Sequence, residues 1–333
     1  MRKPMAALTC AALILLALAL PVVPGYVAAA EQAVRVGYVH VFDDAPVLVA
    51  RDGRFYERYG VNVDVQAFTS GPTLAKALVA DRLDIGVMGF TNALTWAAQG
   101  ADLYIVGKVQ NGYHALVTRA DSGIKDLADL RGKRIASQGA GSTADIVLKG
   151  VVLPAGGLKA NDVQLLYTDP ATALQSLLAG RVDAAFLFEP FDRMFRYQTP
   201  AREIYEVGKK WPFPCMVIVV SGRFMRENPA ALSRFLQANQ ASIEFMKNRA
   251  NEAAELLAPL FVPEGYIETP KGRVPAVQIT GEALATQVFD WKITSSDISR
   301  MQELMEIMLA QGLLKERVDI GKILAVPEQA SRK

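Results

Sequence analysis

The sequence predicts an α/β protein of two lobes, each with a mostly parallel β-sheet flanked by helices, the two joined by a two-strand hinge. Short apolar segments of strand length alternate along the chain with segments of helical periodicity, and this alternation indicates parallel sheets covered by helices. The same order of segments occurs twice, at a constant offset of 99 residues from Leu74 to Ala173. A duplicated α/β unit therefore predicts two lobes of similar construction.

The repeat is clearest where a helical segment leads into a short apolar strand. LAKALVADRLDIGVMGF at 74–90 corresponds to ALQSLLAGRVDAAFLFE at 173–189, so that Asp84 takes the place of Asp183. Three further pairs share the offset: Arg35 and Arg134, Asn62 and Asn161, and Thr73 and Thr172. One offset shared by several elements indicates duplication.

Each unit is expected to contain strand, helix, strand, helix and strand. In the first unit these are a buried strand at 34–39, a helix at 45–59, a strand at 61–68, a helix from Thr73 and a short strand at 83–89. The sequence VNVDVQAF alternates apolar and polar residues, as a half-buried strand does. Thr73 is a plausible N-cap for the helix that it opens. The second unit repeats this order from Lys133 to Phe188.

The remaining segments complete the domain prediction. An apolar run at 215–220 indicates a return strand, and helical patterns follow at 224–248, 250–260 and 296–312. Because these helices have no sheet of their own, we place them on the first lobe. The expected division is a signal peptide at 1–30, a first lobe at 31–118 plus 220–333, and a second lobe at 119–219. The chain then crosses between lobes near 117–121 and 215–221, and a double crossing predicts hinge closure around a ligand.

The first thirty residues have the order of an export signal. Arg2 and Lys3 precede an apolar run at 11–20, and small residues at 28–30 offer a cleavage site. The alternative is a retained membrane anchor, but the run falls short of the roughly 20 apolar residues that span a bilayer. The sequence therefore predicts a cleaved signal peptide and a periplasmic protein.

Charge and cysteine content exclude several classes of function. The chain has 36 Lys+Arg and 34 Asp+Glu, and removal of Arg2 and Lys3 with the signal leaves the two numbers equal. A chain without basic excess is not expected to bind nucleic acid or an anionic membrane surface. After removal of the signal, Cys215 is the single cysteine, so no intramolecular disulfide forms. We interpret Cys215 as a small apolar residue of a buried strand, and we expect a monomer.

The binding site is expected at the carboxyl ends of the strands, where open parallel sheets bind their ligands. In the second lobe this place is the turn that contains Gln138, Gly141, Ser142 and Thr143, between a strand and a helix. Free N–H groups and the helix dipole there favour an anion or a partly negative oxygen. The alternative is an ordinary serine or threonine N-cap, which needs no ligand.

A second turn of the same kind lies in the first lobe. Gly89, Phe90, Thr91 and Asn92 follow a buried strand and open the helix at 93–99. Thr91 or Asn92 can cap that helix or donate a hydrogen bond to a ligand, and the sequence leaves both readings open.

Aromatic rings and carboxylates near the same strand ends complete the candidate ligand contacts. They are Tyr38, His40, Asp44, Glu189, Phe191 and Trp211. Aromatic rings with a few polar groups are typical of small-molecule pockets. Packing of the hinge for the rings, and a solvated rim for the carboxylates, are the alternatives.

No catalytic or metal-binding motif is present. The sequence lacks a GxSxG elbow, a P-loop and an HExxH motif, and its two histidines, His40 and His114, form no metal-ligand spacing with cysteine. We therefore expect no catalytic residues, no cofactor and no metal.

Several of these segments together resemble a known family. DLRGKRI at 129–135, followed by Gly141-Ser142-Thr143, is the most specific; LDIG at 83–86, GRVDA at 180–184 and FEPF at 188–191 add to it. The chain resembles the periplasmic binding proteins of ABC importers for nitrate, sulfonate and taurine, a group also likened to the fungal pyrimidine-precursor synthase. The resemblance implies a type II periplasmic binding protein fold with ligand contacts at the turns named above. Sulfonate binders tend to have tryptophan near the Glu-Pro step, where this chain has Phe188, so the solute stays open.

The resemblance and the export signal together predict a transport receptor. It would capture a small polar or anionic solute, such as nitrate, a sulfonate, taurine or a related heterocycle, and deliver it to the membrane permease of an ABC transporter. The alternatives are an enzyme on the same fold, such as a pyrimidine-precursor synthase or a small-molecule lyase, and a sensory module. Export and the missing catalytic constellation favour transport.

Overall fold

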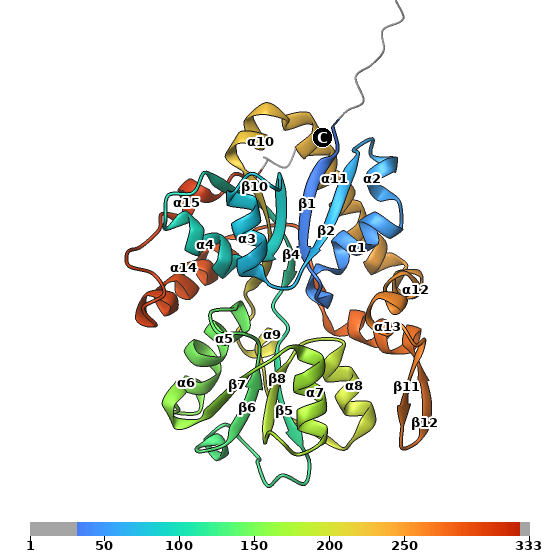
Figure 1. Cartoon of the computed structure of the whole chain (residues 1–333), viewed down its shortest axis with the longest axis vertical. Coiled ribbons are helices and arrows are strands. Elements are labelled where there is room, and N and C mark those ends of the chain that lie inside the picture. Colours follow the sequence, from blue (N-terminus) through green and yellow to red (C-terminus); the bar gives the residue numbers. More distant parts are fainter. Residues whose placement is uncertain (1–31, 327–333) are drawn as a thin grey trace, which may run out of the picture. The chain divides into compact units, whose positions relative to one another are not determined.

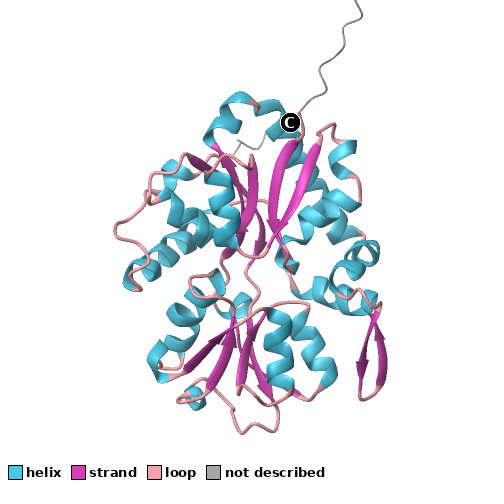
Figure 2. Ribbon diagram, in the orientation of Figure 1, coloured by secondary structure: helices cyan, strands magenta, loops and turns pink. Residues whose placement is uncertain are grey.

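Two β-sheets organise the part of the chain that the computed structural model describes, residues 32–326 (Figure 1). The predicted signal peptide at 1–30 lies outside the described residues. Helices flank both sheets, as Figure 2 shows, so the expected alternation of strands and helices is present.

The first sheet has six strands in the order β13-β4-β10-β3-β1-β2. Their bounds are β1 Val34–Val39, β2 Val63–Phe68, β3 Ile85–Gly89, β4 Leu103–Asn111, β10 Pro214–Ser221 and β13 Val288–Phe289. β1 pairs in parallel with β2 and β3, whereas β10 is antiparallel to both β3 and β4. The carboxyl ends of β1 and β3 therefore lie at one edge, where the sequence predicts ligand contacts.

Helices from the N-terminal and the C-terminal half of the sequence flank this sheet. They are the 3-10 turn η1 Phe42–Asp44, α1 Ala45–Asp52, α2 Phe55–Arg58, α3 Gly71–Val79, α4 Phe90–Ala97, α10 Gly222–Glu227, α11 Pro229–Asn248, α12 Ala250–Phe261, α14 Ser295–Ala310 and α15 Ile320–Ile323. The helices expected at 250–260 and 296–312 are present within a few residues of their predicted ends, whereas the one expected at 224–248 is divided at Asn228 into α10 and α11.

The second sheet has five strands in the order β7-β6-β8-β5-β9. The strands are β5 Ala115–Arg119, β6 Arg134–Ser137, β7 Gln164–Tyr167, β8 Ala184–Leu187 and β9 Ala201–Glu206. Its helical segments are η2 Ala128–Leu130, α5 Thr143–Val147, the π-helical segment η3 Leu148–Val152, α6 Leu153–Ala155, η4 Ala160–Asp162, α7 Pro170–Leu178, α8 Phe191–Gln198 and α9 Val207–Lys210. A hairpin, β11 Tyr266–Thr269 and β12 Gly272–Pro275, precedes α13 Ala276–Thr286.

The repeated sequence forms the same local structure in both sheets. Arg35 donates to Asp84 through its backbone N–H at 2.9 Å and its Nε at 3.0 Å. Arg134 makes the same two bonds to Asp183, at 2.8 and 3.1 Å. Each pair ties a first strand to the start of its neighbour, β3 or β8. The duplication therefore repeats a structural ion pair.

The helix after the second strand of each unit begins earlier than the sequence suggested. Ser70, not Thr73, is the N-cap of α3, and its Oγ accepts the Thr73 N–H at 3.4 Å. At the equivalent place in α7, Asp169 accepts the Thr172 N–H at 2.9 Å. Proline in the first turn, Pro72 in α3, fits because N–H groups there have no partner within the helix.

The chain passes between the sheets earlier than expected at both crossings. β5 already belongs to the second sheet, so the first crossing is at 112–114, and the second is at 211–213, before β10. The Gly112 N–H donates to the Phe213 carbonyl at 2.8 Å, so the two crossings run against each other. A Cβ on Gly112 would lie 2.2 Å from the Phe213 ring, so this contact requires glycine. Because apolar strand segments lie on both sides of each crossing, the sequence does not indicate where the chain leaves one sheet and enters the other.

The C-terminal helices do not all pack on the first sheet. Ala276 and Ile279 of α13 share a buried cluster with Met194 and Phe195 of α8, which flanks the second sheet. The chain then returns to the first sheet, where β13 pairs with β4. The sequence-based division places all of 220–333 in the first lobe and predicts no helix at 276–286, and the local sequence does not indicate on which sheet such a helix packs. The division into two lobes with the stated bounds remains a prediction.

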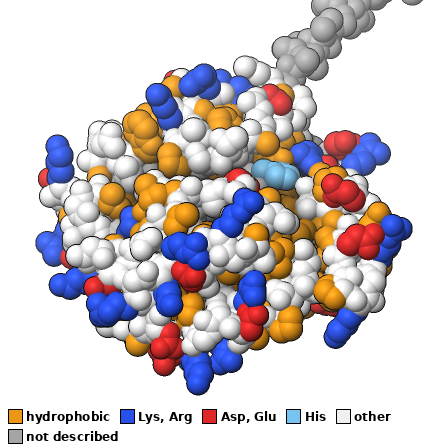
Figure 3. Space-filling model, turned by 60° about the horizontal axis from the view of Figure 1, so that its bottom comes forward, with side chains coloured by type: hydrophobic (Ala, Val, Ile, Leu, Met, Phe, Trp, Pro, Cys, Tyr) orange, Lys and Arg blue, Asp and Glu red, His pale blue; other side chains and the backbone are white. Residues whose placement is uncertain are grey.

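The surface agrees with the charge balance of the sequence. On the face in Figure 3, acidic and basic side chains are interspersed. Within residues 32–326, no helix has the length and apolar character needed to cross a membrane.

Candidate functional site

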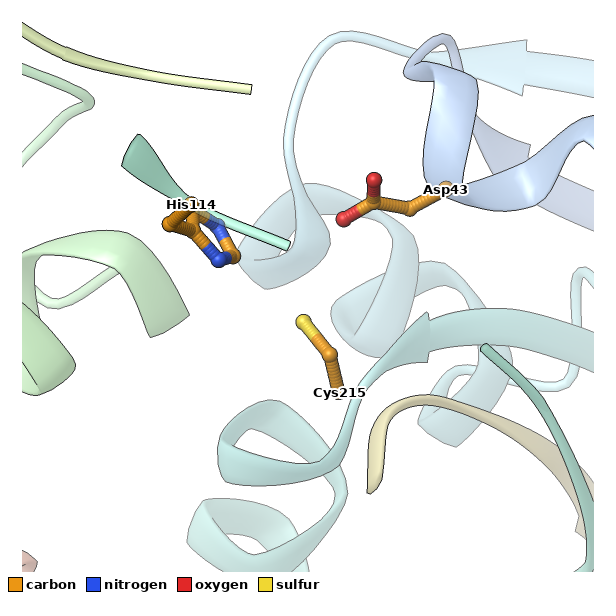
Figure 4. A group of neighbouring side chains, drawn as sticks. All are labelled: Asp43, His114 and Cys215. Atoms are coloured by element: carbon orange, nitrogen blue, oxygen red, sulfur yellow. The ribbon is translucent and has the colours of Figure 1, made fainter. Parts of the chain in front are cut away.

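Three chemically reactive side chains meet where the two sheets are connected (Figure 4). Asp43 lies in η1, directly after β1; His114 lies in the first crossing; and Cys215 lies at the start of β10, after the second crossing. Their ligand-type atoms all lie within 4.8 Å of one another. All three residues are at most 4% exposed. The structure thus brings together residues that are 172 positions apart in the sequence.

The local structure explains how Asp43 comes to point inward. Asp44, its neighbour, accepts the Val39 N–H through Oδ2 at 2.9 Å, and this bond closes the turn that follows β1. Asp43 Oδ1 and Asp44 Oδ1 are buried without a hydrogen-bond partner, and so is His114 Nδ1. A buried polar group left unpaired costs about 1–3 kcal/mol, so a cluster of them indicates a functional rather than a structural role.

Burial keeps the cluster uncharged. It raises the pKa of Asp43 to about 8, with a smaller contribution from the charge of Glu189. It lowers the pKa of His114 to about 4 and raises the pKa of the Cys215 thiol. In the protein alone at neutral pH, the carboxyl, the imidazole and the thiol are therefore all largely neutral.

Aromatic rings form the walls around His114. Its ring stacks on Phe186, with centroids 5.3 Å apart, and lies nearly parallel to Phe213 at 6.4 Å. Phe188 approaches it edge-on at 6.1 Å and in turn contacts Phe191 at 5.9 Å. These apolar walls account for the depressed pKa of the imidazole, since they disfavour its charged form.

Glu189, a candidate from the sequence, is also buried. Its Oε1 accepts a hydrogen bond from the Thr286 hydroxyl at 2.9 Å, and Arg193 pairs with it at 3.4 Å. Burial, followed by the charge of Asp192, raises the pKa of Glu189 to about 7. It lies in the interior and not on a solvated rim.

Thr91 and Thr143 join the two candidate turns of the sequence. Their hydroxyl oxygens are 2.7 Å apart and both residues are buried. Gly89, which precedes α4, makes this possible, because a Cβ there would lie 2.2 Å from the Thr143 hydroxyl. The N-terminal turns of α4 and α5, which belong to different sheets, therefore meet at this contact.

The turn at 141–143 uses part of its hydrogen-bonding capacity internally. Ser142 is the N-cap of α5, since its Oγ accepts the Asp145 N–H at 3.2 Å. The Gly141 N–H donates to Asp145 Oδ2 at 2.8 Å, and Lys149 pairs with the same carboxylate. The N-cap that the sequence allowed at this turn is therefore present at Ser142. Gln138, at the start of the turn, is half-buried.

The remaining sequence candidates lie in different surroundings. Tyr38 and Phe90 are buried, and Asn92 lies beside Gly71. His40 contacts the Leu260 carbonyl at 3.2 Å through Nε2 and stacks on Phe261 at 5.2 Å.

Trp211 faces α14. Its indole N–H donates to Glu303 at 3.2 Å, and Arg300 lies over its ring. Its ring also packs against Phe213, with centroids 5.3 Å apart, and Phe213 is one of the rings around His114.

A separate cavity of about 480 Å³ adjoins the first crossing. Asn111, Gly112 and Tyr113 line it together with Arg193 and Arg196. None of the site residues predicted from the sequence lines this cavity.

Sequence reasoning overlooked Asp43, His114 and Cys215 as a group. Each stands alone in the sequence, on a different element, so no motif spacing connects them. The one available indication was that Asp43 follows a strand end and that His114 and Cys215 lie near the expected crossings.

Comparison with known proteins decides the family. A model of the NMT1-like family matches residues 28–260, well over half of the chain. The chain belongs to the NMT1-like family. The predicted resemblance to this group is thereby confirmed.

Several relatives of this NMT1-like protein have names that refer to binding. A binding protein of Brucella abortus is 28% identical over 260 residues, covering 76% of this chain and 80% of the relative. An aliphatic sulfonates-binding protein of Bacillus subtilis is 29% identical over 222 residues, covering 65% of this chain and 66% of the relative.

Solved structures confirm the predicted α/β fold of periplasmic binding proteins. The periplasmic aliphatic sulphonate-binding protein SsuA of Escherichia coli matches with a TM-score of 0.74 and 23% identity, over 91% of this chain and 94% of that one. The alkanesulfonate-binding SsuA of Xanthomonas axonopodis, bound to MOPS, matches with a TM-score of 0.72 and 25% identity, over 89% and 99%. The desulfurization enzyme DSZB matches with a TM-score of 0.64 at 16% identity, so the fold also occurs in enzymes.

Proposed function

We propose that this chain is an extracytoplasmic receptor that captures a small polar or anionic solute between its two sheets and delivers it to the membrane permease of an ABC transporter. The observation that carries the proposal is the meeting of the N-terminal turns of α4 and α5 at Thr91 and Thr143. A solute that is held by residues of both sheets would bind where the turns that follow their strands come into contact.

The chemistry of this place suits a negatively charged or strongly polar group. The residue before α4 is Gly89, which has no side chain to cap the helix, so the first N–H groups of α4 can serve a ligand. One of the two threonine hydroxyls donates to the other, and the second is left to donate to a ligand. At α5 the carboxylate of Asp145 already occupies the turn, so we place the anionic group of the solute on the α4 side.

The names of relatives support the class of solute that we propose. Proteins with similar sequences are named for sulfonates and taurine. We therefore propose nitrate, a sulfonate, a taurine-like molecule or a related heterocycle as the solute.

Export and a monomeric state belong to the same proposal. The charge and apolar order of 1–30 supports a cleaved signal peptide, and periplasmic location is part of the name of a related taurine-binding protein of Escherichia coli. Intact-mass measurement of protein recovered from the periplasm tests cleavage. A mass that includes the first thirty residues contradicts it.

An enzyme on the same fold is the second candidate, and the proximity of Cys215 and His114 favours it. An activated cysteine needs a thiolate, which a neighbouring imidazolium or other positive charge stabilises. Here burial raises the thiol pKa and lowers the imidazole pKa, so the pair lacks that activation. The receptor is therefore the function that the geometry supports better.

The test is direct binding by the purified protein. Titration calorimetry with sulfonates, taurine and nitrate should give a stoichiometric complex that is recovered unchanged. Conversion of a bound molecule into product would favour the enzyme instead.

A further inference from the structure

Solute capture at Thr91 and Thr143 leaves the cluster of Asp43, His114 and Cys215 without a role. These side chains offer a carboxylate oxygen, an imidazole nitrogen and a sulfur from three separate segments, and Figure 4 shows that they converge on a common point. We propose that Asp43, His114 and Cys215 form a binding site for one divalent transition-metal ion, with zinc the preferred metal.

The donor set selects the class of metal. Sulfur and imidazole nitrogen favour zinc and its neighbours in the first transition row, whereas calcium and magnesium prefer sites built of oxygen alone. Three protein ligands are also the number found in zinc sites that keep a fourth position for water or another small molecule.

The spacing of the ligand atoms is close to what zinc requires. Zn–N and Zn–S bonds of about 2.0 and 2.3 Å place tetrahedral ligands roughly 3.3–3.8 Å apart. The upper limit of 4.8 Å here exceeds that by about 1 Å, which small side-chain rotations can close.

Charge and polar satisfaction support the same conclusion. Asp43 Oδ1 and His114 Nδ1 are buried atoms without a hydrogen-bond partner, and a coordinated ion supplies one to each. The negative charges of a thiolate and a carboxylate together balance the two positive charges of zinc. The occupied site is therefore neutral, and no net charge is buried in the protein interior.

The surroundings hold the central ligand in place. The ring of His114 packs against Phe186 and Phe213, and its backbone carbonyl accepts the Val207 N–H at 2.9 Å. Such packing fixes the orientation of a ligand, and an apolar shell limits access of solvent.

The experiment uses the whole chain in a Cys10→Ser background, where Cys215 is the remaining thiol. The protein is freed of metal with a chelator and titrated with Zn²⁺ by calorimetry and with Co²⁺ by absorption spectroscopy. We expect one equivalent per chain and a thiolate-to-cobalt charge-transfer band. Asp43→Asn, His114→Gln and Cys215→Ser should each weaken Zn²⁺ binding at least about 100-fold, since even outer contacts cost 10–100-fold.

Matched controls separate this site from incidental surface binding. His40→Gln removes the other histidine, and Asp52→Asn removes an exposed carboxylate; both should leave Zn²⁺ affinity and the cobalt band unchanged. Absence of stoichiometric binding, absence of the thiolate band, or loss of binding in His40→Gln overturns the proposal. If a cluster variant fails to fold, the cobalt spectrum of the parent protein still decides. The result is independent of solute capture, which is measured at Thr91 and Thr143.

Discussion

The hydroxyl of Thr91 lies 2.7 Å from the hydroxyl of Thr143, and this contact joins α4 of the six-stranded sheet to α5 of the five-stranded sheet. Both residues are buried, and Gly89 leaves the space that the contact needs. The proposed solute site is built around this pair, and the consequences can be tested residue by residue.

Replacing either threonine by valine should weaken solute binding while conserving side-chain shape. A hydrogen bond to a charged group is worth about 1.5–3 kcal/mol, and 1.4 kcal/mol corresponds to one decade of affinity. Thr91→Val and Thr143→Val should therefore each raise the Kd at least about tenfold in calorimetry. Thr95→Val is the control, because the Thr95 hydroxyl donates within α4 to the Thr91 carbonyl. If all three variants bind the solute with the same affinity as the parent protein, the solute does not bind at this contact.

Ser142→Ala should affect stability and not affinity. Its hydroxyl caps α5 through the Asp145 N–H, and loss of such a cap typically costs about 1 kcal/mol of unfolding free energy. Urea unfolding and calorimetric titration of the same variant separate the two effects. A tenfold loss of affinity with unchanged stability would make Ser142 a ligand contact.

The two repeated Arg–Asp pairs should differ in strength. The Asp84 side chain is 8% exposed, whereas that of Asp183 is 29% exposed. Removal of either carboxylate leaves an arginine and its backbone N–H without this partner, and Arg35 is less exposed than Arg134, at 29% against 41%. Asp84→Ala should therefore lower the unfolding free energy by more than Asp183→Ala. Urea unfolding of both variants checks the order, and the reverse order would contradict it.

Glu189 should make the protein less stable as the pH rises. Burial raises its pKa from the ordinary 4.5 to about 7, so the folded protein holds a proton that the unfolded chain releases in this interval. Its stabilising contribution is complete below pH 4.5 and is lost as the pH rises to 7. Relative to Glu189→Gln, the parent should lose roughly 3 kcal/mol of unfolding free energy between pH 4.5 and 8. A constant difference between the two proteins across this range would contradict the raised pKa.

Much of the secondary structure could be predicted because its determinants are local. The alternation in VNVDVQAF and the helical spacing of Leu74 and Leu78 are properties of neighbouring residues, and both elements are present. The arginine and the aspartate of each repeated pair could be recognised from the alignment of the two repeats. That each aspartate also accepts the backbone N–H of its arginine, in the first strand of the unit, became clear only from the structure.

Features that depend on tertiary partners could not be predicted in the same way. The crossings lie at 112–114 and 211–213, because strand pairing and not composition decides where one sheet ends. The hydrogen bond of the Trp211 indole to Glu303, 92 positions away in the sequence, likewise depends on tertiary packing. The approach of His114 to Cys215 depends on two crossings that run side by side, which no local pattern encodes.

The central claim is that the chain binds a small polar solute at the contact of α4 and α5 without converting it. The most direct measurement is a thermal-shift screen of sulfonates, taurine, nitrate, amino-pyrimidines, flavins and small carboxylates on the parent protein and on Thr91→Val. We predict that one class stabilises the parent, by about 2.7 kcal/mol at 100 times its Kd, and stabilises the variant less at the same concentration. Equal stabilisation of both proteins, or chemical conversion of the solute, would contradict it.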